Sequence, residues 1–485
     1  AGVDELRQAI EQDDSDALLG IFTRAKAARE HFTHMLAGTA YAKTMKQKDI
    51  EFIVQPGGKL NGALRVPGDK SISHRSIMLG SLAEGVTEVS GFLEGEDALA
   101  TLQAFRDMGV VIEGPNNGEV KIHGVGLHGL QPPPGAIYCG NSGTSMRLLS
   151  GILSAQKFDT VMTGDPSLSK RPMERVAKPL RSMGAEIQTT GEKGTPPVTI
   201  KGARQLKGFH YDMPVASAQV KSGVLLAGLW ADGETVVTEP APTRDHTERM
   251  LRGFGYDVKV QGATVTVKGG GKLTATKIDV PADISSAAFF MVGASIAEGS
   301  DVTLQHVGLN PTRIGVINIL RAMGGDLTVL NEREVGGEPV ADIRIRSARL
   351  KGIRIPEDQV PLAIDEFPAL FIAAACAEGE TVLTGAEELR VKESDRIQVM
   401  ADGLTILGIQ AQPTPDGIII QGGQLGSGRV VSHGDHRIAM SFAMAALRAS
   451  GPIEIEDCAN DATSFPDFTG LAKRAGLNIS VTEKD

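Results

Sequence analysis

The feature that most constrains the fold of this 485-residue chain is a unit that recurs six times from Phe52 onward. Each copy has an apolar helix, a short β-rich stretch, a second helix ending in a turn such as Met108-Gly109, and one or two strands. The copies lie about 70 residues apart, which is too long for the common solenoid repeats. The pattern predicts α/β units in which helices pack on sheets. The apolar helices are predicted at Ser73–Leu82, Thr144–Leu153, Ser217–Leu229, Ser285–Ala297, Asp365–Ala377 and His436–Ala449.

The composition narrows the class of protein. Hydrophobic residues make up 41% and charged residues 22%, as in ordinary soluble proteins. The net charge of -10 argues against a nucleic-acid partner. No apolar run approaches the length of a membrane span, and no secretory signal is visible. Cys139, Cys376 and Cys458 are widely separated and form no metal-ligand pattern, so we expect a cytoplasmic protein without metal or cofactor.

Residues 1–48 differ in pattern from the repeat region. Helical periodicity runs from Asp4 to Ala37, and Asp13–Asp16 predicts a break into two helices with a cap at the join. We interpret the segment as the helical tail of an upstream fused domain rather than an expression tag, because it is amphipathic and rich in helix formers. The positions expected to face inward are Leu6, Ile10, Leu18, Ile21, Phe22 and Ala25.

The stretch Pro67–Arg75, Pro-Gly-Asp-Lys-Ser-Ile-Ser-His-Arg, precedes the apolar run Ser76–Ala83. Its glycine permits a sharp turn, and its aspartate and serines are favourable helix caps. Lys70, Ser71 and Arg75 are therefore expected at or near a helix start, where unpaired amides and the helix dipole favour an anion. Taken alone, the stretch is more typical of a capped helix with solvated charges than of an anion site.

The same arrangement recurs, because the first helix of every copy opens on small, polar or charged residues. If the copies are arranged alike, these amino termini face one place and form an anion-binding cleft in a net-negative protein. The opening residues are Ser71/Ser73, Gly143/Thr144, Ser217/Gln219, Ser285/Ser286, Asp365/Glu366 and His436/Arg437.

Three further motifs carry chemistry, although each is weak when taken alone. Gly140–Arg147 is a Gly-rich loop running into a helix, and its amides suit an anion, but it is neither a Walker loop nor a dinucleotide fingerprint. Arg390–Arg396 alternates charges at a helix start, which is usually a solvated face. Asp435-His436-Arg437 precedes an apolar helix, where a lone His is usually a cap or a core residue.

Taken together and in this order, the motifs resemble the enolpyruvyl transferase family, and within it the branch that acts on shikimate 3-phosphate in aromatic amino acid biosynthesis. The resemblance covers about residues 52–480. The motifs that carry it are Gly68–Ser71 with Arg75, Gly140–Arg147, Lys170-Arg171-Pro172, Ser217-Ala218-Gln219, Arg390–Arg396 and Asp435-His436-Arg437.

The resemblance implies an α/β fold of two similar domains, each built from three repeated βαβαββ-type units as an inside-out α/β barrel. A double crossover hinge near Gly68–Lys70 and Pro281–Asp283 would join them, with the active site in the interdomain cleft and closure on the substrate. One domain is then expected at 70–280, and the other at 52–69 plus 281–485. Residues 1–48 more weakly resemble the end of a fused prephenate dehydrogenase, and we expect a monomeric catalytic unit.

The resemblance also assigns substrates and residues. The family transfers the enolpyruvyl group of phosphoenolpyruvate to the 5-hydroxyl of shikimate 3-phosphate and is the target of glyphosate. Asp365, Glu393 and Lys70 match its catalytic positions. Shikimate 3-phosphate would contact Lys70, Ser71, Arg75, Ser217, Ala218, Gln219, Arg244, Asp365 and Lys392. Phosphoenolpyruvate would contact Lys70, Asn141, Gly143, Arg171, Gln219, Glu393, Arg396, His436 and Arg437.

Some positions depart from the family pattern. Ala218 and Arg244 stand where many members have Ser, as in the other major subclass, and Leu148 stands where many have Pro. Thr463 stands where many have a Lys that contacts phosphoenolpyruvate.

Two alternatives remain. The sister enzyme that modifies a UDP-sugar shares the fold but needs a Cys acid on a mobile loop, and Cys139 precedes the Gly loop. The other alternative is a non-catalytic anion-binding protein. The presence of Asp365, Glu393 and Lys70 together argues against it.

Overall fold

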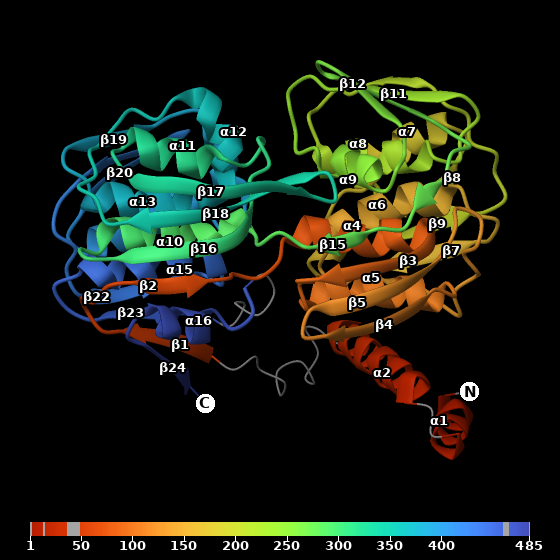
Figure 1. The fold of residues 1–485 in the computed structure, drawn as a ribbon, viewed down its shortest axis with the longest axis horizontal. Coiled ribbons are helices and arrows are strands. Elements are labelled where there is room, and N and C mark those ends of the chain that lie inside the picture. The colour runs from red at the N-terminus through yellow and green to blue at the C-terminus, as the bar shows by residue number, and fades with distance from the viewer. Residues whose placement is uncertain (1, 13–14, 36–48, 459–464, 485) are drawn as a thin grey trace. The chain divides into compact units, whose positions relative to one another are not determined.

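The computed structural model describes residues 2–12, 15–35, 49–458 and 465–484, which fall into two compact units (Figure 1). Unit 1 contains the described residues within 1–46 together with Lys70–Val280. Unit 2 contains those within 47–69 together with 281–485.

Unit 1 holds the two N-terminal helices and three copies of the repeat. Its helices are α1 (Gly2–Glu11), α2 (Ser15–Met35), α4 (Lys70–Leu82), α5 (Glu96–Asp107), α6 (Gly143–Ser154), η1 (Leu168–Lys170), α7 (Glu174–Ser182), α8 (Ala218–Ala227) and α9 (His246–Gly253). Its strands are β3 (Ala83–Ser90), β4 (Val111–Asn116), β5 (Glu119–Val125), β6 (Ile137–Tyr138), β7 (Thr160–Thr163), β8 (Glu186–Thr190), β9 (Thr195–Lys201), β10 (His210–Asp212), β11 (Glu234–Thr238), β12 (Val258–Gln261), β13 (Thr264–Lys268), β14 (Leu273–Thr274) and β15 (Lys277–Asp279).

Unit 2 holds the other three copies. Its helices are α10 (Ile284–Ile296), α11 (Gly315–Ala322), η2 (Glu357–Gln359), α12 (Val360–Ala363), η3 (Ile364–Glu366), α13 (Phe367–Cys376), η4 (Glu387–Val391), α14 (Arg396–Ile406), α15 (His436–Ala445), η5 (Ala446–Arg448) and α16 (Phe468–Ala475). Its strands are β1 (Asp49–Val54), β2 (Asn61–Leu64), β16 (Asp301–Gly308), β17 (Asp326–Val335), β18 (Glu338–Arg346), β19 (Glu380–Leu383), β20 (Gln410–Thr414), β21 (Gly417–Gln421), β22 (Gly428–Val431), β23 (Ile453–Glu456) and β24 (Ile479–Lys484).

The sheets repeat one strand pattern, as the six sequence copies predicted. In unit 1 the orders β14-β3-β5-β4, β6-β7-β9-β8 and β10-β11-β13-β12 each have one parallel pair followed by two antiparallel pairs. In unit 2, β2-β16-β18-β17 and β22-β23-β1-β24 follow the same rule. The antiparallel sheet β19-β21-β20 has isolated parallel bridges, from Lys351 and Arg354, beside β19.

The first helix of each copy is an inner helix, buried along nearly its whole length. In unit 2 every residue of α10 is buried, and α10, α13 and α15 contact one another. In unit 1, α4 is buried from Ile72 to Leu82, and α6 packs closely on α8. Helices that are apolar on every side gain most of their stability from such all-round burial. The predicted apolar helices are therefore confirmed, except that α13 begins at Phe367, after the short η3 turn.

The predicted break of the N-terminal segment into two helices is confirmed, because α1 ends at Glu11 and α2 begins at Ser15; part of the predicted cap, Asp13 and Asp14, lies outside the described residues. Three of the expected inner positions are wrong: Ile10 and Phe22 are 60% and 62% exposed, and Ala25 is exposed.

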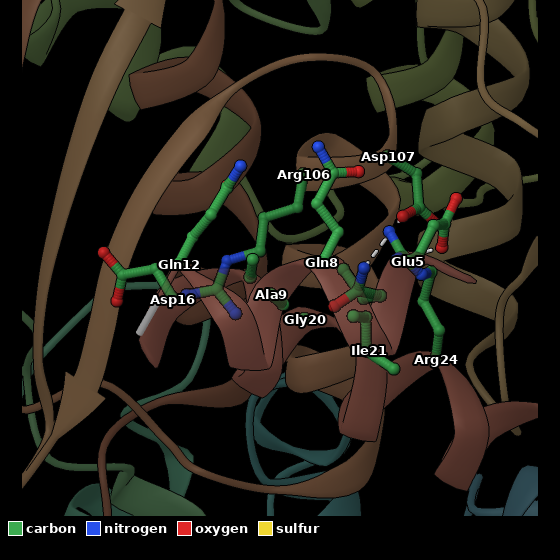
Figure 2. Close-up of a pocket in the computed structure, with 12 residues that line it drawn as sticks. Glu5, Gln8, Ala9, Gln12, Asp16, Gly20, Ile21, Arg24, Arg106 and Asp107 are labelled. Atoms are coloured by element: carbon green, nitrogen blue, oxygen red, sulfur yellow. Dashed lines mark hydrogen bonds and ion pairs between the residues drawn. The ribbon is translucent and has the colours of Figure 1, made fainter. Parts of the chain in front are cut away.

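Instead, α1 and α2 face α5 across a hollow of about 340 Å³ (Figure 2). Most of the residues that line it are polar or charged, including Gln8, Arg106 and Asp107, and the lining residue Ala9 is buried. Burial lowers the pKa of Arg106 and raises the pKa of Asp107. Apolar periodicity failed to find this face because small and polar side chains form it.

Among the described residues, one helical stretch, Glu357–Cys376, is long and apolar enough to cross a membrane. The sequence analysis did not identify this stretch as an apolar run. Most of it is buried inside unit 2, and it is divided into η2, α12, η3 and α13. Acidic residues at its start and middle explain why no continuous apolar run was visible in the sequence.

The chain leaves unit 2 after Asp69 and re-enters it at Pro281, and hydrogen bonds join these two segments. The amide of Asp69 donates to Pro281 O over 2.8 Å, and that of Asp283 donates to Pro67 O over 2.9 Å. Arg313, which is 6% exposed, forms ion pairs with both Asp69 and Asp283, the latter at 2.8 Å. These carboxylates raise the pKa of Arg313 above its ordinary value against the effect of burial.

We predict that Arg313→Met destabilises unit 2 by about 3–5 kcal/mol, because it leaves two buried carboxylates without their cation. Urea unfolding measures the change. Arg344→Met is the matched control, since the Arg344–Asp301 pair is exposed and a much smaller change is expected. Equal midpoints for the two variants would contradict the role given to Arg313.

Candidate active site

In unit 1 the amino-terminal turns of the three inner helices are joined by hydrogen bonds. The three contacts link α4 to α6, α8 to α6 and α4 to α8. They are His74 Nδ1 to Ser145 Oγ at 3.1 Å, Gln219 Nε2 to Thr144 Oγ1 at 2.8 Å, and Arg75 Nη2 to Ser222 Oγ at 3.2 Å. The starts of the three inner helices of this unit therefore lie close together, as the prediction requires of them, and such a gathering of positive dipole ends favours an anion.

Lys70, the first residue of α4, forms an ion pair with Asp97 in the first turn of α5. Asp97 is buried, whereas the Lys70 side chain is 36% exposed. An ammonium group has three protons, so the Asp97 carboxylate can hold Lys70 in place and still leave protons on the exposed side that could bind an anion. Ser71, beside it, is half-buried.

The guanidinium of Arg75 points into unit 1. The residue is 5% exposed, and its Nε donates to Thr247 Oγ1 over 2.8 Å. Its Nη1 donates to the carbonyl of Ser71 over 3.1 Å. Protein groups therefore hold all three of its nitrogens, counting the bond to Ser222.

Two guanidinium groups converge on Gly143. A methyl group at Gly143 would lie 2.7 Å from Arg147 Nη1 and 2.9 Å from Arg171 Nη1. Burial, together with the charges of Arg171 and Arg175, lowers the pKa of Arg147 to about 10. Arg147 Nη1 also donates to Gln219 Oε1. Such crowding of like charges at a helix start favours a bound anion.

The remaining predicted residues of unit 1 lie at or near helix starts. Asn141 is exposed, one residue before the cap Ser142, whose Oγ accepts from Ser145 N over 3.0 Å. Ser217 caps α8 through a 3.3 Å bond from Val220 N. Ala218 and Arg244 are half-buried, at the first residue of α8 and just before α9, respectively.

In unit 2 the predicted carboxylates gather around one buried cation. Arg396, at the start of α14, is 1% exposed. Its Nη2 donates to Glu393 Oε2 over 2.6 Å, and its Nε donates to Asp435 Oδ2 over 2.9 Å. Its Nη1 lies 3.7 Å from Asp365 Oδ1. Lys392 Nζ lies 3.8 Å from the same oxygen of Asp365.

The helix starts of unit 2 meet as those of unit 1 do. Asp435 caps α15 by accepting from Arg437 N over 3.2 Å, and Ser394 Oγ donates to Asp435 Oδ2 over 2.8 Å. Ser285, in the first turn of α10, donates to Glu366 Oε2 over 3.3 Å just before α13. The starts of α10, α13, α14 and α15 therefore surround one group of charged side chains.

This environment sets the protonation of the group. Burial opposes ionisation of Glu393, but the charge of Arg396, a backbone hydrogen bond and the charge of Arg437 together outweigh it and hold the pKa of Glu393 below its usual value. The same balance of burial against Arg396 lowers the pKa of Asp435. Burial, with the neighbouring Arg437, lowers the pKa of His436 to about 4. His436 is therefore neutral at pH 7, and Glu393 and Asp435 are ionised.

Sequence reasoning missed three residues of these groups. Arg147 lies four positions after Gly143, the helical spacing that brings its side chain back over the helix start, so its position in the motif was a usable signal. Asp435 stood in a quoted motif as the expected cap. Asp97 had no sequence signal, because only folding brings it to Lys70. Thr463 lies outside the described residues.

In the part of the chain that the structure describes, no group of three or more His, Cys, Asp and Glu side chains is arranged to hold a metal ion.

Two α/β units whose inner helices present cations and carboxylates at their starts define the class of the enolpyruvyl transferases. The family model described as EPSP synthase (3-phosphoshikimate 1-carboxyvinyltransferase) matches residues 54–471. The chain belongs to this family and is a transferase.

Relatives cover nearly all of the repeat region. The 3-phosphoshikimate 1-carboxyvinyltransferase of Methylococcus capsulatus is 70% identical over 438 residues, which is 90% of this chain and 100% of the relative. That of Alkalilimnicola ehrlichii is 68% identical over 432 residues, 89% of this chain and 97% of the relative. The solved EPSP synthase of Acinetobacter baumannii is 71% identical, with a TM-score of 0.87, over 89% of this chain and 100% of that one.

We predict that the imidazole of His436 titrates near pH 4 in the folded protein, because burial disfavours its charged form. NMR of the imidazole protons, assigned with His436→Asn, measures the midpoint. The unfolded chain, with an ordinary midpoint near 6.5, is the control. The neutral ring stabilises the fold above that value, and this contribution is lost as pH falls from about 6.5 to about 4. A folded midpoint between 6 and 7 would refute the assignment.

Proposed function

We propose that the two groups of residues described above carry out the transfer of the enolpyruvyl group of phosphoenolpyruvate to the 5-hydroxyl of shikimate 3-phosphate, the reaction of this family in the shikimate pathway. The observation that carries the proposal is the contact of Arg396 with Asp365 and Glu393 in unit 2. It brings the two predicted acid–base carboxylates to one buried guanidinium group.

The chemistry explains why two carboxylates are needed. The 5-hydroxyl loses a proton as it attacks C2 of phosphoenolpyruvate, and C3 gains one. The tetrahedral ketal then loses phosphate and a C3 proton. The reaction therefore needs a base and an acid of different pKa. We assign the hydroxyl proton to Asp365 and the C3 proton to Glu393. Lys70, held by Asp97, would stabilise the leaving phosphate.

The cations of the two groups suit the anionic parts of the substrates. We assign phosphoenolpyruvate to Arg171, Arg396 and Arg437, with Asn141, Gly143, Gln219 and His436 beside it. Arg396 Nη1 is beyond hydrogen-bond distance of Asp365, so its protons remain for an anion. Neutral His436 can accept or donate one hydrogen bond. Shikimate 3-phosphate is assigned to Lys70, Ser71, Arg75, Ser217, Ala218, Gln219, Arg244, Asp365 and Lys392.

The UDP-sugar alternative needs a reactive Cys on a mobile loop. Cys139 is 1% exposed, and burial raises its pKa to about 12. Such a thiol is a poor proton donor at neutral pH. Phosphate release with shikimate 3-phosphate or UDP-N-acetylglucosamine as acceptor tests the choice. Release with the UDP-sugar alone would overturn the proposal, and release with neither would favour a non-catalytic anion-binding protein.

We also propose a cellular compartment, an oligomeric state and an origin for the N-terminal segment. We expect the enzyme to work in the reducing cytoplasm, because none of its three cysteines, all of which the structure describes, forms a disulfide. We expect a monomeric catalytic unit, which sedimentation can test. We interpret residues 1–48 as the tail of a fused upstream domain, and the reading frame upstream of Ala1 decides this. The family model begins at residue 54, beyond that segment.

Asp365→Ala and Glu393→Ala should each lower kcat by roughly 100- to 10,000-fold, the usual contribution of a general acid or base. Substrate binding should persist, because the arginines remain. Rapid-quench turnover and calorimetric binding of shikimate 3-phosphate separate the two effects. Glu388→Ala is the control: Glu388 pairs with Lys392 at 3.3 Å but is well exposed. Near-normal turnover in either first variant would remove that residue from the mechanism.

Gly143→Ala should raise the glyphosate inhibition constant more than the KM of phosphoenolpyruvate. Glyphosate is longer than phosphoenolpyruvate, and the new methyl would push against Arg147 and Arg171. A small clash in a packed site costs about 1–3 kcal/mol. The ratio of the two constants is the measurement. Gly20→Ala, where a methyl meets nothing within 4 Å, is the control. An unchanged ratio would show that space at Gly143 does not govern inhibitor binding.

A further inference from the structure

A closed triangle of hydrogen bonds lies behind the start of α4. Thr247 Oγ1 accepts from Arg75 Nε over 2.8 Å and donates to Ser222 Oγ over 2.7 Å. Ser222 Oγ also accepts from Arg75 Nη2 over 3.2 Å. Thr247 and Ser222 are each 1% exposed, so bulk water cannot replace either hydroxyl. Two of the three guanidinium nitrogens thus depend on this hydroxyl pair.

The residues next to the pair fasten the same two helices. Lys221, adjacent to Ser222 on α8, is 1% exposed and forms an ion pair with Glu248 at 3.0 Å. Glu248 is adjacent to Thr247 on α9. Burial raises the pKa of Glu248, and Lys221 opposes that rise. Lys221 also pairs with Glu239 at 2.9 Å. Two consecutive residues of α8, Lys221 and Ser222, therefore contact two consecutive residues of α9. These contacts fix the position of Thr247.

The chemistry at Thr247 is specific to a hydroxyl. The group must accept from a charged donor and donate to a second hydroxyl, which Val of the same shape cannot do. In a buried site a hydrogen bond from a charged group contributes more to stability than a neutral one. A buried donor left without its partner destabilises the protein. Arg75 in a variant without the hydroxyl would therefore turn toward another acceptor.

We propose that Thr247 is a positioning residue for shikimate 3-phosphate: its hydroxyl, held by Ser222, sets the orientation of Arg75. The inference rests on the proposed function, in which Arg75 contacts that substrate. Thr247 itself need not contact the substrate. Because Thr247 acts through Arg75, removing its hydroxyl should weaken the binding of shikimate 3-phosphate. The binding of phosphoenolpyruvate should be unaffected.

The experiment compares Thr247→Val with Thr247→Ser in the full chain. Thr247→Val should raise the calorimetric Kd and the KM of shikimate 3-phosphate about tenfold, the effect of losing one hydrogen bond to a charged group. The KM of phosphoenolpyruvate should stay within about twofold. Thr247→Ser keeps the hydroxyl and should restore shikimate 3-phosphate binding. The matched control is Thr160→Val, which removes a buried hydroxyl of the same unit that has no hydrogen-bond partner.

Each outcome decides the proposal. It is overturned if Thr247→Val binds shikimate 3-phosphate normally, if Thr160→Val weakens it equally, or if Thr247→Ser does not restore binding. If Thr247→Val does not fold, Ser222→Ala decides: weaker shikimate 3-phosphate binding with unchanged phosphoenolpyruvate KM supports the inference, and normal binding overturns it. A wild-type protein that turns over neither acceptor overturns the proposed function, whereas normal turnover with an indifferent Thr247→Val overturns this inference alone.

Discussion

The constraint on which the rest of the structure depends is the burial of the inner helices on every side. A helix such as α10, with no exposed residue, cannot place a polar side chain along its length without leaving it buried. Its polar chemistry is confined to its ends, where the first amides need partners. Caps such as Ser142, Ser217, Asp283 and Asp435 supply them. The polar and charged side chains of the inner helices therefore gather at the helix starts.

This constraint explains what could be predicted from the sequence. The recurrence of apolar helices with polar first residues was enough to predict the helix positions, the six sheets and most candidate residues, because these features have local sequence signals. Asp97 and Thr247 could not be found, since each acts through a residue that is distant in sequence. Ile10 and Phe22 were misplaced because periodicity assumes an apolar interface, whereas α5 offers Arg106 and Asp107. The substrate roles proposed for these residues came from the resemblance to the family.

The two units distribute charge differently. In unit 1, Arg147 and Arg171 approach Gly143 and form no ion pair within the described residues, so this region holds excess positive charge suited to an anion. In unit 2, Arg396 contacts three carboxylates, and its charge is largely compensated. A compensated group binds an anion less strongly, but it keeps carboxylates ionised in a buried place. Anion binding thus suits the first group, and proton transfer suits the second.

The balance at Glu393 links these two tasks. Burial alone would raise the pKa of Glu393, and it is low because Arg396, a backbone hydrogen bond and, more weakly, Arg437 together outweigh burial. An anion bound to those arginines would offset their charge, and burial would then dominate and raise the pKa of Glu393. Glu393, which is ionised while the charges of these arginines act on it, would gain a proton as phosphoenolpyruvate binds, and the protonated form is the one needed to protonate C3. Loss of phosphate would reverse the shift. The low pKa of Glu393 therefore fits an acid role in which the bound substrate raises that pKa.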